Sequence, residues 1–204
     1  MNDGAQKRKP GRPPSTQARE KALHAARNIL HESGLGALTI EAVASRSGTG
    51  KPTLYRHWAN ALELGMDALI ADMSPALPPD LENAPRAAII RQLDRFVEVL
   101  SPPRGRQIVH ALALCDAERA VSERFRIHVL DKSRDAARET ILHFVARGQL
   151  QAPRDMDILL DSLFAPLFFR VLTGHGVDKA LPAQLVDTAF APLEPGSPRE
   201  GHDT

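Results

Sequence analysis

Basic, hydroxyl and aromatic side chains lie close together in the segment GTGKPTLYRHW, residues 48–58. Those that could bind a ligand are Lys51, Thr53, Tyr55, Arg56 and His57. Cationic and hydroxyl groups hold phosphate oxygens, and side chains near the start of a helix can meet base edges in the major groove of DNA. The segment therefore predicts a DNA-contacting helix, with an ordinary pair of packed helices as the alternative.

A short helix ahead of this segment would hold it in place. The hydroxyl of Thr39 can cap the free amides of its first turn, and Ile40, Val43 and Ala44 follow at helical spacing. Gly48 stands just past the last periodic residue, where a left-handed backbone costs least. We expect a helix that begins at Thr39 and ends at a short glycine turn.

The second helix would start at residues 50–52, GKP, with proline in its first turn. Leu54 and Trp58 are four residues apart and can anchor it to the first helix. The polar and basic side chains of the segment are then left to face outward.

Charge is unevenly distributed along the 204 residues, although the net charge is only +1. Residues 1–58 hold ten Lys or Arg against four Asp or Glu, and the remainder holds sixteen against twenty-one. A basic first part suits phosphate neutralisation with release of counterions, while the acidic remainder stays off the duplex. A merely solvated basic tail is the alternative.

The basic arm, KRKPGRPP at residues 7–14, contains prolines that forbid a helix. Its central Gly-Arg-Pro, with Arg12, resembles an AT-hook core, which could enter a narrow A·T-rich minor groove. Plain electrostatic attachment to the DNA is the alternative for so short a motif.

Two further helices complete the first domain. Apolar residues recur at three- and four-residue spacing within residues 16–33, and this helix should end near Gly34. Asn60 can cap another helix, whose apolar stripe runs from Leu62 to Met73 before prolines stop it.

This pattern resembles the N-terminal region of the TetR family of bacterial transcriptional regulators. The matching residues are TIEAVA at 39–44 and GTGKPTLYRHW at 48–58, and the close match extends over roughly residues 18–70. The later part of the chain matches only in helical style.

The resemblance implies roles for individual residues. Thr39 and Tyr55 would hold phosphates, and Lys51 and Thr53 would lie at the start of the recognition helix, close to bases or backbone. The full predicted DNA-binding set is Arg12, Thr39, Thr49, Lys51, Thr53, Tyr55, Arg56 and His57.

The chain departs from the family pattern at two places. Gly50 stands where the family usually has serine, and Asn60-Ala61-Leu62 replaces serine-lysine-glutamate. Asn60 keeps the helix cap, but Ala61 lacks a phosphate-contacting lysine. We hypothesise that the basic arm offsets this lost contact.

The rest of the chain predicts a second helical unit, because helical apolar stripes run through it and no strand pattern competes. Pro75–Pro85 is a proline-rich connector. Stripes follow up to Leu100 and from Ile108 to Leu114, and a longer, mostly charged helix from Phe125 can run until Gly148.

Residues 155–174 are apolar nearly all round, which implies burial on two sides. A membrane span is disfavoured because Asp157, Asp161, Pro166 and Arg170 interrupt a run that is also too short. Together with residues 181–191, this segment resembles the dimerising helices of the family. A homodimer would place two recognition helices on a palindromic operator in double-stranded DNA.

The family also implies a pocket for a small-molecule effector, whose identity the sequence does not give. The predicted lining residues are His110, Leu114, Cys115, Phe144, Phe168, Phe169 and Arg170. Each is also compatible with plain core packing. Arg170 could meet an anionic ligand or form a salt bridge with an aspartate.

Other functional classes lack support. No metalloprotease motif, phosphate loop or nucleophile elbow is present, so we expect no enzyme and no cofactor. His110 and Cys115 could join His128 or His143 as metal ligands, but a lone cysteine makes this weak, and we predict no metal. The polar N-terminus indicates a cytoplasmic location.

We therefore predict an all-α protein with an N-terminal three-helix helix-turn-helix DNA-binding domain and a larger C-terminal helical ligand-binding and dimerisation domain. Its segments are an arm at 1–15, a DNA-binding domain at 16–74, a connector at 75–85, a helical domain at 86–191 and a disordered tail at 192–204. The expected function is a ligand-released repressor. The alternative is a nonspecific or AT-rich-DNA architectural binding protein.

Overall fold

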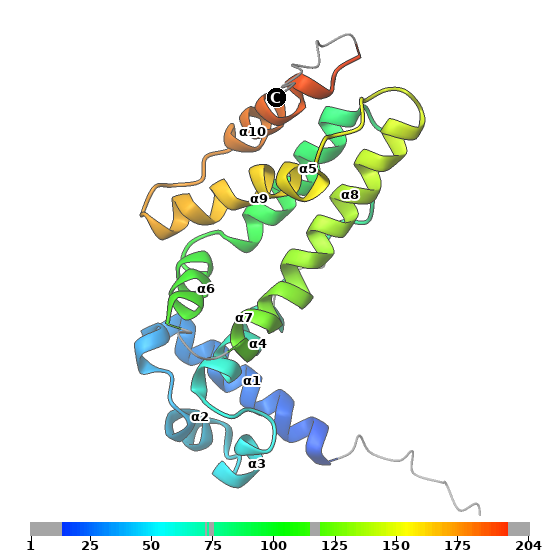
Figure 1. Cartoon of the computed structure of the whole chain (residues 1–204). Coiled ribbons are helices and arrows are strands. Elements are labelled where there is room, and N and C mark those ends of the chain that lie inside the picture. The colour runs from blue at the N-terminus through cyan, green and yellow to red at the C-terminus, as the bar shows by residue number, and fades with distance from the viewer. Residues whose placement is uncertain (1–13, 72, 74–75, 115–118, 196–204) are drawn as a thin grey trace, which may run out of the picture. The chain divides into compact units, whose positions relative to one another are not determined.

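The structure is a computed structural model that describes residues 14–71, 73, 76–114 and 119–195. Within these ranges every regular element is helical, as Figure 1 shows. The chain divides into two compact units, one up to Ala68 and the other from Leu69 onward. Residues 1–13 of the arm, including Arg12, and most of the predicted tail lie outside the described residues, whereas Pro14 is already the first residue of α1.

The first unit consists of α1 (Pro14–Ser33), a 3-10 turn (Leu35–Ala37), α2 (Ile40–Ser47), α3 (Lys51–Tyr55) and most of α4 (Ala61–Ala71). α1 packs against α2 and α3. Its apolar stripe supplies buried Ala22, Ala26 and Leu30 to the core. Gly34, at a φ of 76°, ends α1 as the sequence predicted.

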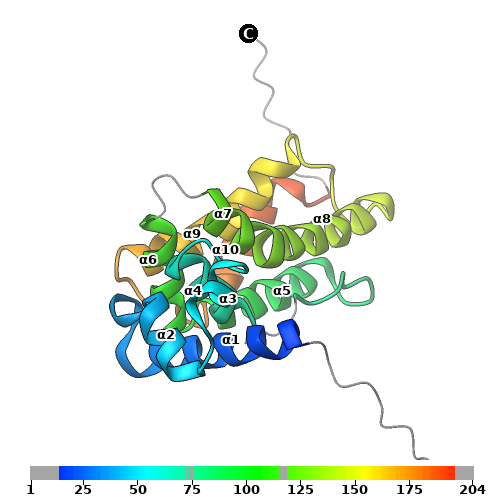
Figure 2. The same cartoon turned by 90° about the horizontal axis from the view of Figure 1, so that it is seen from below.

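The second unit contains α5 (Pro85–Val99), α6 (Arg104–Ala113), α7 (Arg119–Phe125), a π-helical segment (Arg126–Leu130), α8 (Asp131–Ala146), α9 (Met156–Leu172) and α10 (Leu181–Phe190), followed by a 3-10 turn (Ala191–Leu193). α5 packs against α8 and α10, and α9 packs against α6 and α10 (Figures 1 and 2). Aromatic rings fill the centre, where Phe96 meets Phe164 edge-on with 5.0 Å between ring centroids.

The long helix predicted from Phe125 to Gly148 differs from the structure in its first part. Residues Arg126–Leu130 form a π-helix between α7 and α8, which hydrophobic spacing over so few residues does not reveal. The end of the helix agrees with the prediction, since α8 stops at Ala146 and Gly148 has a φ of 69°.

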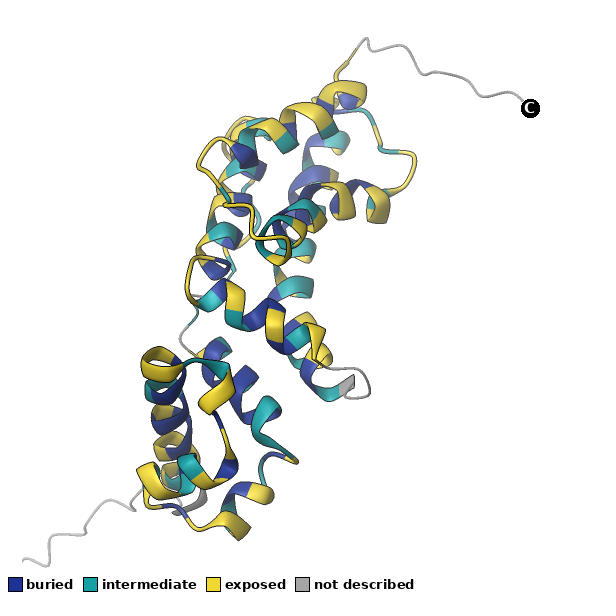
Figure 3. Ribbon diagram, turned by 90° about the vertical axis from the view of Figure 1, so that its left-hand side faces the viewer, coloured by how far each residue is buried: buried dark blue, intermediate teal, exposed yellow. Residues whose placement is uncertain are grey.

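α9 is less buried than its composition suggests. Leu160, Leu163 and Phe164 are buried, but Ile158, Phe169 and Leu172 are exposed in the single chain, and Figure 3 marks such exposed positions in yellow. None of the helices among the described residues is long and apolar enough to cross a membrane.

The predicted connector is part of the second unit. The Oγ1 hydroxyl of buried Thr140 accepts hydrogen bonds from the backbone amide of Asp80 at 3.0 Å and from the side-chain amide of Gln92 at 2.9 Å. The Asp80 carboxylate also pairs with Arg91. These contacts join the connector to α5 and α8.

Candidate functional site

The turn between α2 and α3 has the local structure that the sequence predicted. The Thr39 hydroxyl accepts a hydrogen bond from the Ala42 amide at 3.0 Å and caps α2. Gly48 follows α2 in the left-handed conformation at a φ of 65°, where a side chain would be strained. Gly50 then serves as the N-cap of α3. The two helices are therefore joined by a turn of only three residues.

α3 is a short helix that is anchored by two buried side chains, one of its own and one that follows it. Leu54 and Trp58 are 0% and 1% exposed, and the Trp58 amide donates to the Leu54 carbonyl at 3.0 Å. Lys51, Tyr55 and Arg56 are exposed, as expected for outward-facing groups. Because α3 contributes few buried residues of its own, its position depends on these anchors.

A carboxylate on α4 ties the end of the α3 segment to two other helices. Asp67 accepts a hydrogen bond from the Trp58 indole at 2.9 Å and pairs with Arg19 of α1 at 2.9 Å. The Arg19 guanidinium also lies over the Trp58 ring, 5.7 Å from its centroid. The sequence around Asp67 did not predict this role, since nothing in its local pattern indicates a partner nine residues earlier.

Lys51 is held by an acidic neighbour that the sequence analysis also missed. Its Nζ lies 2.7 Å from Oε1 of Glu41 on α2. This pairing lowers the pKa of the Glu41 carboxyl and raises the pKa of Lys51. A negative charge thus lies beside the cation that would face DNA.

The remaining predicted DNA-binding residues have different environments. Thr53 and His57 are half-buried, and the Thr53 hydroxyl accepts a hydrogen bond from Arg56 at 3.3 Å. Thr49 is only 8% exposed, in contrast to Lys51 and Arg56.

The start of α4 keeps its predicted cap. The side-chain oxygen of Asn60 accepts from the Glu63 amide at 2.9 Å, and the Glu63 carboxylate accepts from the Ala59 amide at 3.4 Å. The pair resembles a capping box, with the Glu63 carboxylate bonded to the amide one residue before the cap. Ala61, which carries no charge, is the first residue of α4.

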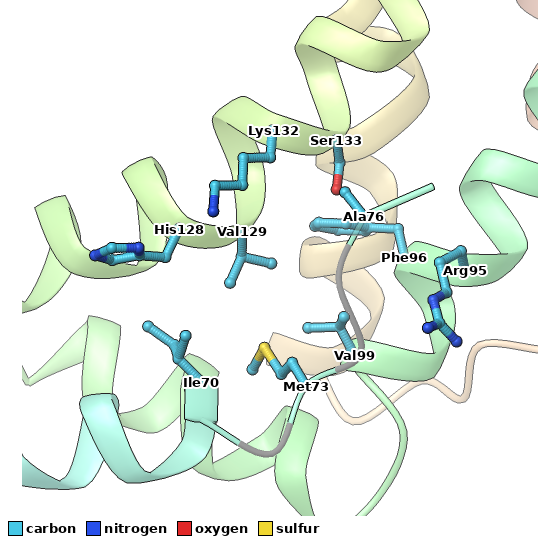
Figure 4. A pocket seen from close by; sticks show the side chains of 10 residues that line it. All are labelled: Ile70, Met73, Ala76, Arg95, Phe96, Val99, His128, Val129, Lys132 and Ser133. Atoms are coloured by element: carbon cyan, nitrogen blue, oxygen red, sulfur yellow. The ribbon is translucent and has the colours of Figure 1, made fainter. Parts of the chain in front are cut away.

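A cavity of about 220 Å³ lies within the second unit (Figure 4). Its walls come from the end of α4, from α5, from the π-helical segment and from α8. Apolar side chains such as Ile70, Phe96 and Val129 line it together with Lys132 and Ser133. The combination of an apolar wall with a few polar groups is typical of small-molecule sites.

Two family models match the chain. The model for bacterial regulatory proteins of the tetR family matches residues 22–64, and the model for tetracyclin repressor-like C-terminal domains matches residues 78–189. The second match alone spans more than half of the chain. The chain belongs to the TetR family. It is a transcriptional regulator whose helix-turn-helix, α2 and α3, binds DNA.

Relatives from other bacteria match over nearly the full chain. The HTH-type transcriptional regulator YdeS of Bacillus subtilis is 25% identical over 193 residues, covering 94% of this chain and 98% of YdeS. The DNA-binding transcriptional repressor TetR of Mycobacteroides abscessus is 26% identical over 192 residues, covering 89% and 97%.

A solved structure supports the same assignment. The crystal structure of a TetR family transcription regulator aligns with a TM-score of 0.67 and 28% identity, covering 88% of this chain and all of the other. The all-helical fold with an N-terminal helix-turn-helix and a C-terminal helical domain is therefore that of the TetR family.

The residues predicted from the sequence to line an effector pocket, as far as the structure describes them, are not among those that line the cavity described above. His110 and Leu114 are exposed, and Cys115 lies outside the described residues. Phe144 is buried beside His143, with 5.2 Å between ring centroids. Composition identified apolar helix residues, but it did not show which side of each helix borders the hollow.

The three predicted pocket residues on α9 are also placed differently. Phe168 packs edge-on against Phe96 and Phe125, with 5.5 Å between centroids in each case. Phe169 is exposed, and Arg170 donates to the Gly176 carbonyl at 3.3 Å.

Candidate metal ligands do not converge in the part of the chain that the structure describes. No group of three His, Cys, Asp or Glu side chains there could hold a metal ion.

Proposed function

We propose that this TetR-family protein is a homodimeric repressor that binds a palindromic operator and leaves it when a small molecule binds. The observation that carries the proposal is α3, a short helix fixed by buried Leu54 and Trp58 with Lys51, Tyr55 and Arg56 exposed. A helix of this kind suits the major groove, where exposed cations meet phosphates and base edges. The repressor role rests on the likeness to the named repressor of Mycobacteroides abscessus.

The DNA contacts follow from this arrangement. Lys51 and Thr53, at the start of α3, would reach base edges or nearby phosphates, and Tyr55 and Thr39 would hold phosphates. Arg56 and His57 would add contacts at the end of the helix, and Arg12 would contribute from the arm. Thr49 is the weakest member of the set, because its side chain is buried.

An exposed stripe on α9 supports the homodimer. Ile158, Ser162, Ala165, Phe169 and Leu172 recur at alternating four- and three-residue spacing, and all are exposed in the single chain. That spacing forms one seam along a helix, and the small residues in its middle allow a second helix to approach closely. Isolated large apolar side chains are common on surfaces, but a continuous seam indicates an interface.

The exposed face of α10 extends this surface. Gln184 and Thr188 of α10, and Ala191 of the 3-10 turn that follows, are exposed at the same alternating spacing, and α9 packs against α10. Two copies related by a two-fold axis would pair these faces with themselves. The dimer would then present two α3 helices to successive major grooves of a palindrome.

Helix α4 offers a route from an effector to DNA. Its Asp67 holds Trp58 in the first unit, and its Ile70, one helical turn later, lines the cavity of the second. A ligand that favours one position of Ile70 would therefore act on the helix that supports the recognition segment. Release requires only that the ligand bind the two states with different affinities.

The test begins with selection of bound fragments from genomic DNA. The best fragment is then titrated against a scrambled one by fluorescence anisotropy at two salt concentrations. We expect a palindrome that binds at least about a thousand-fold more tightly than the scramble. Equal and steeply salt-dependent binding to both fragments would instead favour nonspecific architectural binding.

Two variants make the test residue-specific. Lys51→Gln should weaken operator binding, whereas Lys179→Gln, which changes an exposed lysine in the second unit, should leave it unchanged. If both variants bind the operator equally well, Lys51 of α3 does not contribute to the DNA interface.

A further inference from the structure

The cavity in the second unit is lined by basic and apolar side chains. Among the lining residues that the structure describes none is acidic, and Arg95, His128 and Lys132 are basic residue types. The other described lining residues are apolar except for Ser133. A hollow with this composition favours a ligand that combines an apolar body with a negative charge.

Two of the lining residues, Lys132 and Ser133, come from α8, and their polar groups point into the cavity. In Figure 4 the Lys132 amine extends into the space between α8 and the end of α4, and the Ser133 hydroxyl faces the same space. Among the described residues Lys132 forms no ion pair, whereas Arg95 pairs with Glu98 and turns away. The Lys132 amine is therefore a cation available to a ligand in the cavity.

The local backbone gives a second, independent indication of a site. His128 and Val129, which both line the cavity, lie in the π-helical segment. A π-helical turn is rare and occurs mostly at functional positions, because it inserts one extra residue and re-aims the side chains around it. Here the turn places a histidine next to Lys132 at the wall of the cavity.

We propose that this cavity binds a small organic anion, a carboxylate on a compact apolar body. Lys132 neutralises the carboxylate, the Ser133 hydroxyl donates a hydrogen bond to it, and Ile70, Val129 and Phe96 contact the apolar body. The cavity volume of about 220 Å³ is below the roughly 300–1,000 Å³ of ordinary ligand pockets, so the ligand is smaller than a typical drug. The inference rests on the proposed function, since it names the chemical class of the effector.

The probes are benzoate, phenylacetate and hexanoate, each compared with its uncharged amide, and benzylamine as a cation. Binding to the full-length protein is measured without DNA by ligand-observed NMR and calorimetry. We expect at least one acid to bind and its amide to bind about ten-fold more weakly. Binding of none of the acids, or of amides and benzylamine equally well, would overturn the proposal.

Variants locate the binding. Lys132→Met should lower the affinity for the acid about ten-fold, and Ser133→Ala should lower it by a smaller factor. Lys179→Met, at an exposed lysine away from the cavity, should leave this affinity unchanged. Circular dichroism checks that each variant is folded. Unchanged acid affinity in both Lys132→Met and Ser133→Ala would place the anion elsewhere and refute the site.

The same acid added to the protein–operator complex separates this inference from the proposed function. Acid binding that depends on Lys132 but releases no DNA would leave the anion site intact and remove its effector role. Operator binding by a protein that takes none of the acids would refute the anion site alone.

Discussion

The indole N–H of Trp58 donates a hydrogen bond to the carboxylate of Asp67, with Nε1 and Oδ2 2.9 Å apart. Trp58 is the last residue of the recognition segment, residues 51–58, which contains α3. Asp67 belongs to α4, the helix that also contributes Ile70 to the cavity. Because α3 has so few buried residues, this bond and the Asp67–Arg19 pair determine much of its orientation.

Removal of the Asp67 carboxylate tests this anchor. Asp67→Ala leaves the buried indole N–H unpaired, and we expect a loss of about 1–3 kcal/mol in the free energy of unfolding together with weaker operator binding. Chemical denaturation and anisotropy measure the two effects. Glu32→Ala, which breaks the exposed pair with Arg46, is the control and should change neither much. Equal effects of both substitutions would show that the anchor has no special role.

The Glu41–Lys51 pair predicts a variant with tighter DNA binding. Glu41→Gln removes the carboxylate that competes with phosphate for the Lys51 amine, so operator affinity should rise a few-fold at low salt. Anisotropy titrations at several salt concentrations measure the change. If affinity falls instead, Glu41 holds Lys51 in its DNA-binding position rather than competing for it.

The exposed seam on α9 predicts a variant that does not dimerise. Phe169→Glu puts a charge on the proposed interface and should give a monomer with much weaker operator binding. Leu142→Glu is the matched control, because Leu142 is an exposed apolar residue on α8 outside the seam. Light scattering coupled to size-exclusion chromatography gives the masses. A Phe169→Glu protein that remains dimeric would exclude α9 as the interface.

Ion pairs between α8 and α9 predict a specific acid sensitivity. Asp157 accepts a hydrogen bond from Arg138 at 2.6 Å, and Arg138 and Arg134 lower its pKa below the ordinary value of 3.8. The unfolded chain therefore takes up the proton at higher pH than the folded one, so acid favours unfolding. The contribution is present above the ordinary value and is lost as the pH falls through the lowered pKa.

Asp157→Asn lacks this contribution at every pH. We expect wild type to be the more stable at neutral pH and the two proteins to converge once the pH is well below 3.8, measured by urea unfolding across a pH series. Asp135→Asn changes an exposed carboxylate on α8, and its free energy of unfolding should follow that of wild type across the pH series. A constant difference between wild type and Asp157→Asn down to the lowest pH would contradict the assignment.

Local features of the helix-turn-helix were accessible from the sequence. Thr39 and Asn60 cap their helices, Gly48 adopts the left-handed backbone, and Leu54 and Trp58 are buried four residues apart. Each of these depends on groups within a few residues of one another, or on which face of one helix is apolar. Such interactions are formed by the segment itself, so residue type and spacing predict them.

The cavity and the acidic partners were decided by tertiary packing. The sequence indicated apolar helices around a pocket, yet the hollow lies beside Ile70, Val129 and Lys132, at the end of α4 and at a π-helical turn. Asp67 and Glu41 acquire their roles only when α4 and α2 are brought next to the recognition segment. The chain by itself thus determined most of the helices and the helix-turn-helix, because these follow from local periodicity and capping. Only the folded chain decided which faces enclose the cavity and which charges meet, because those contacts join residues on different helices.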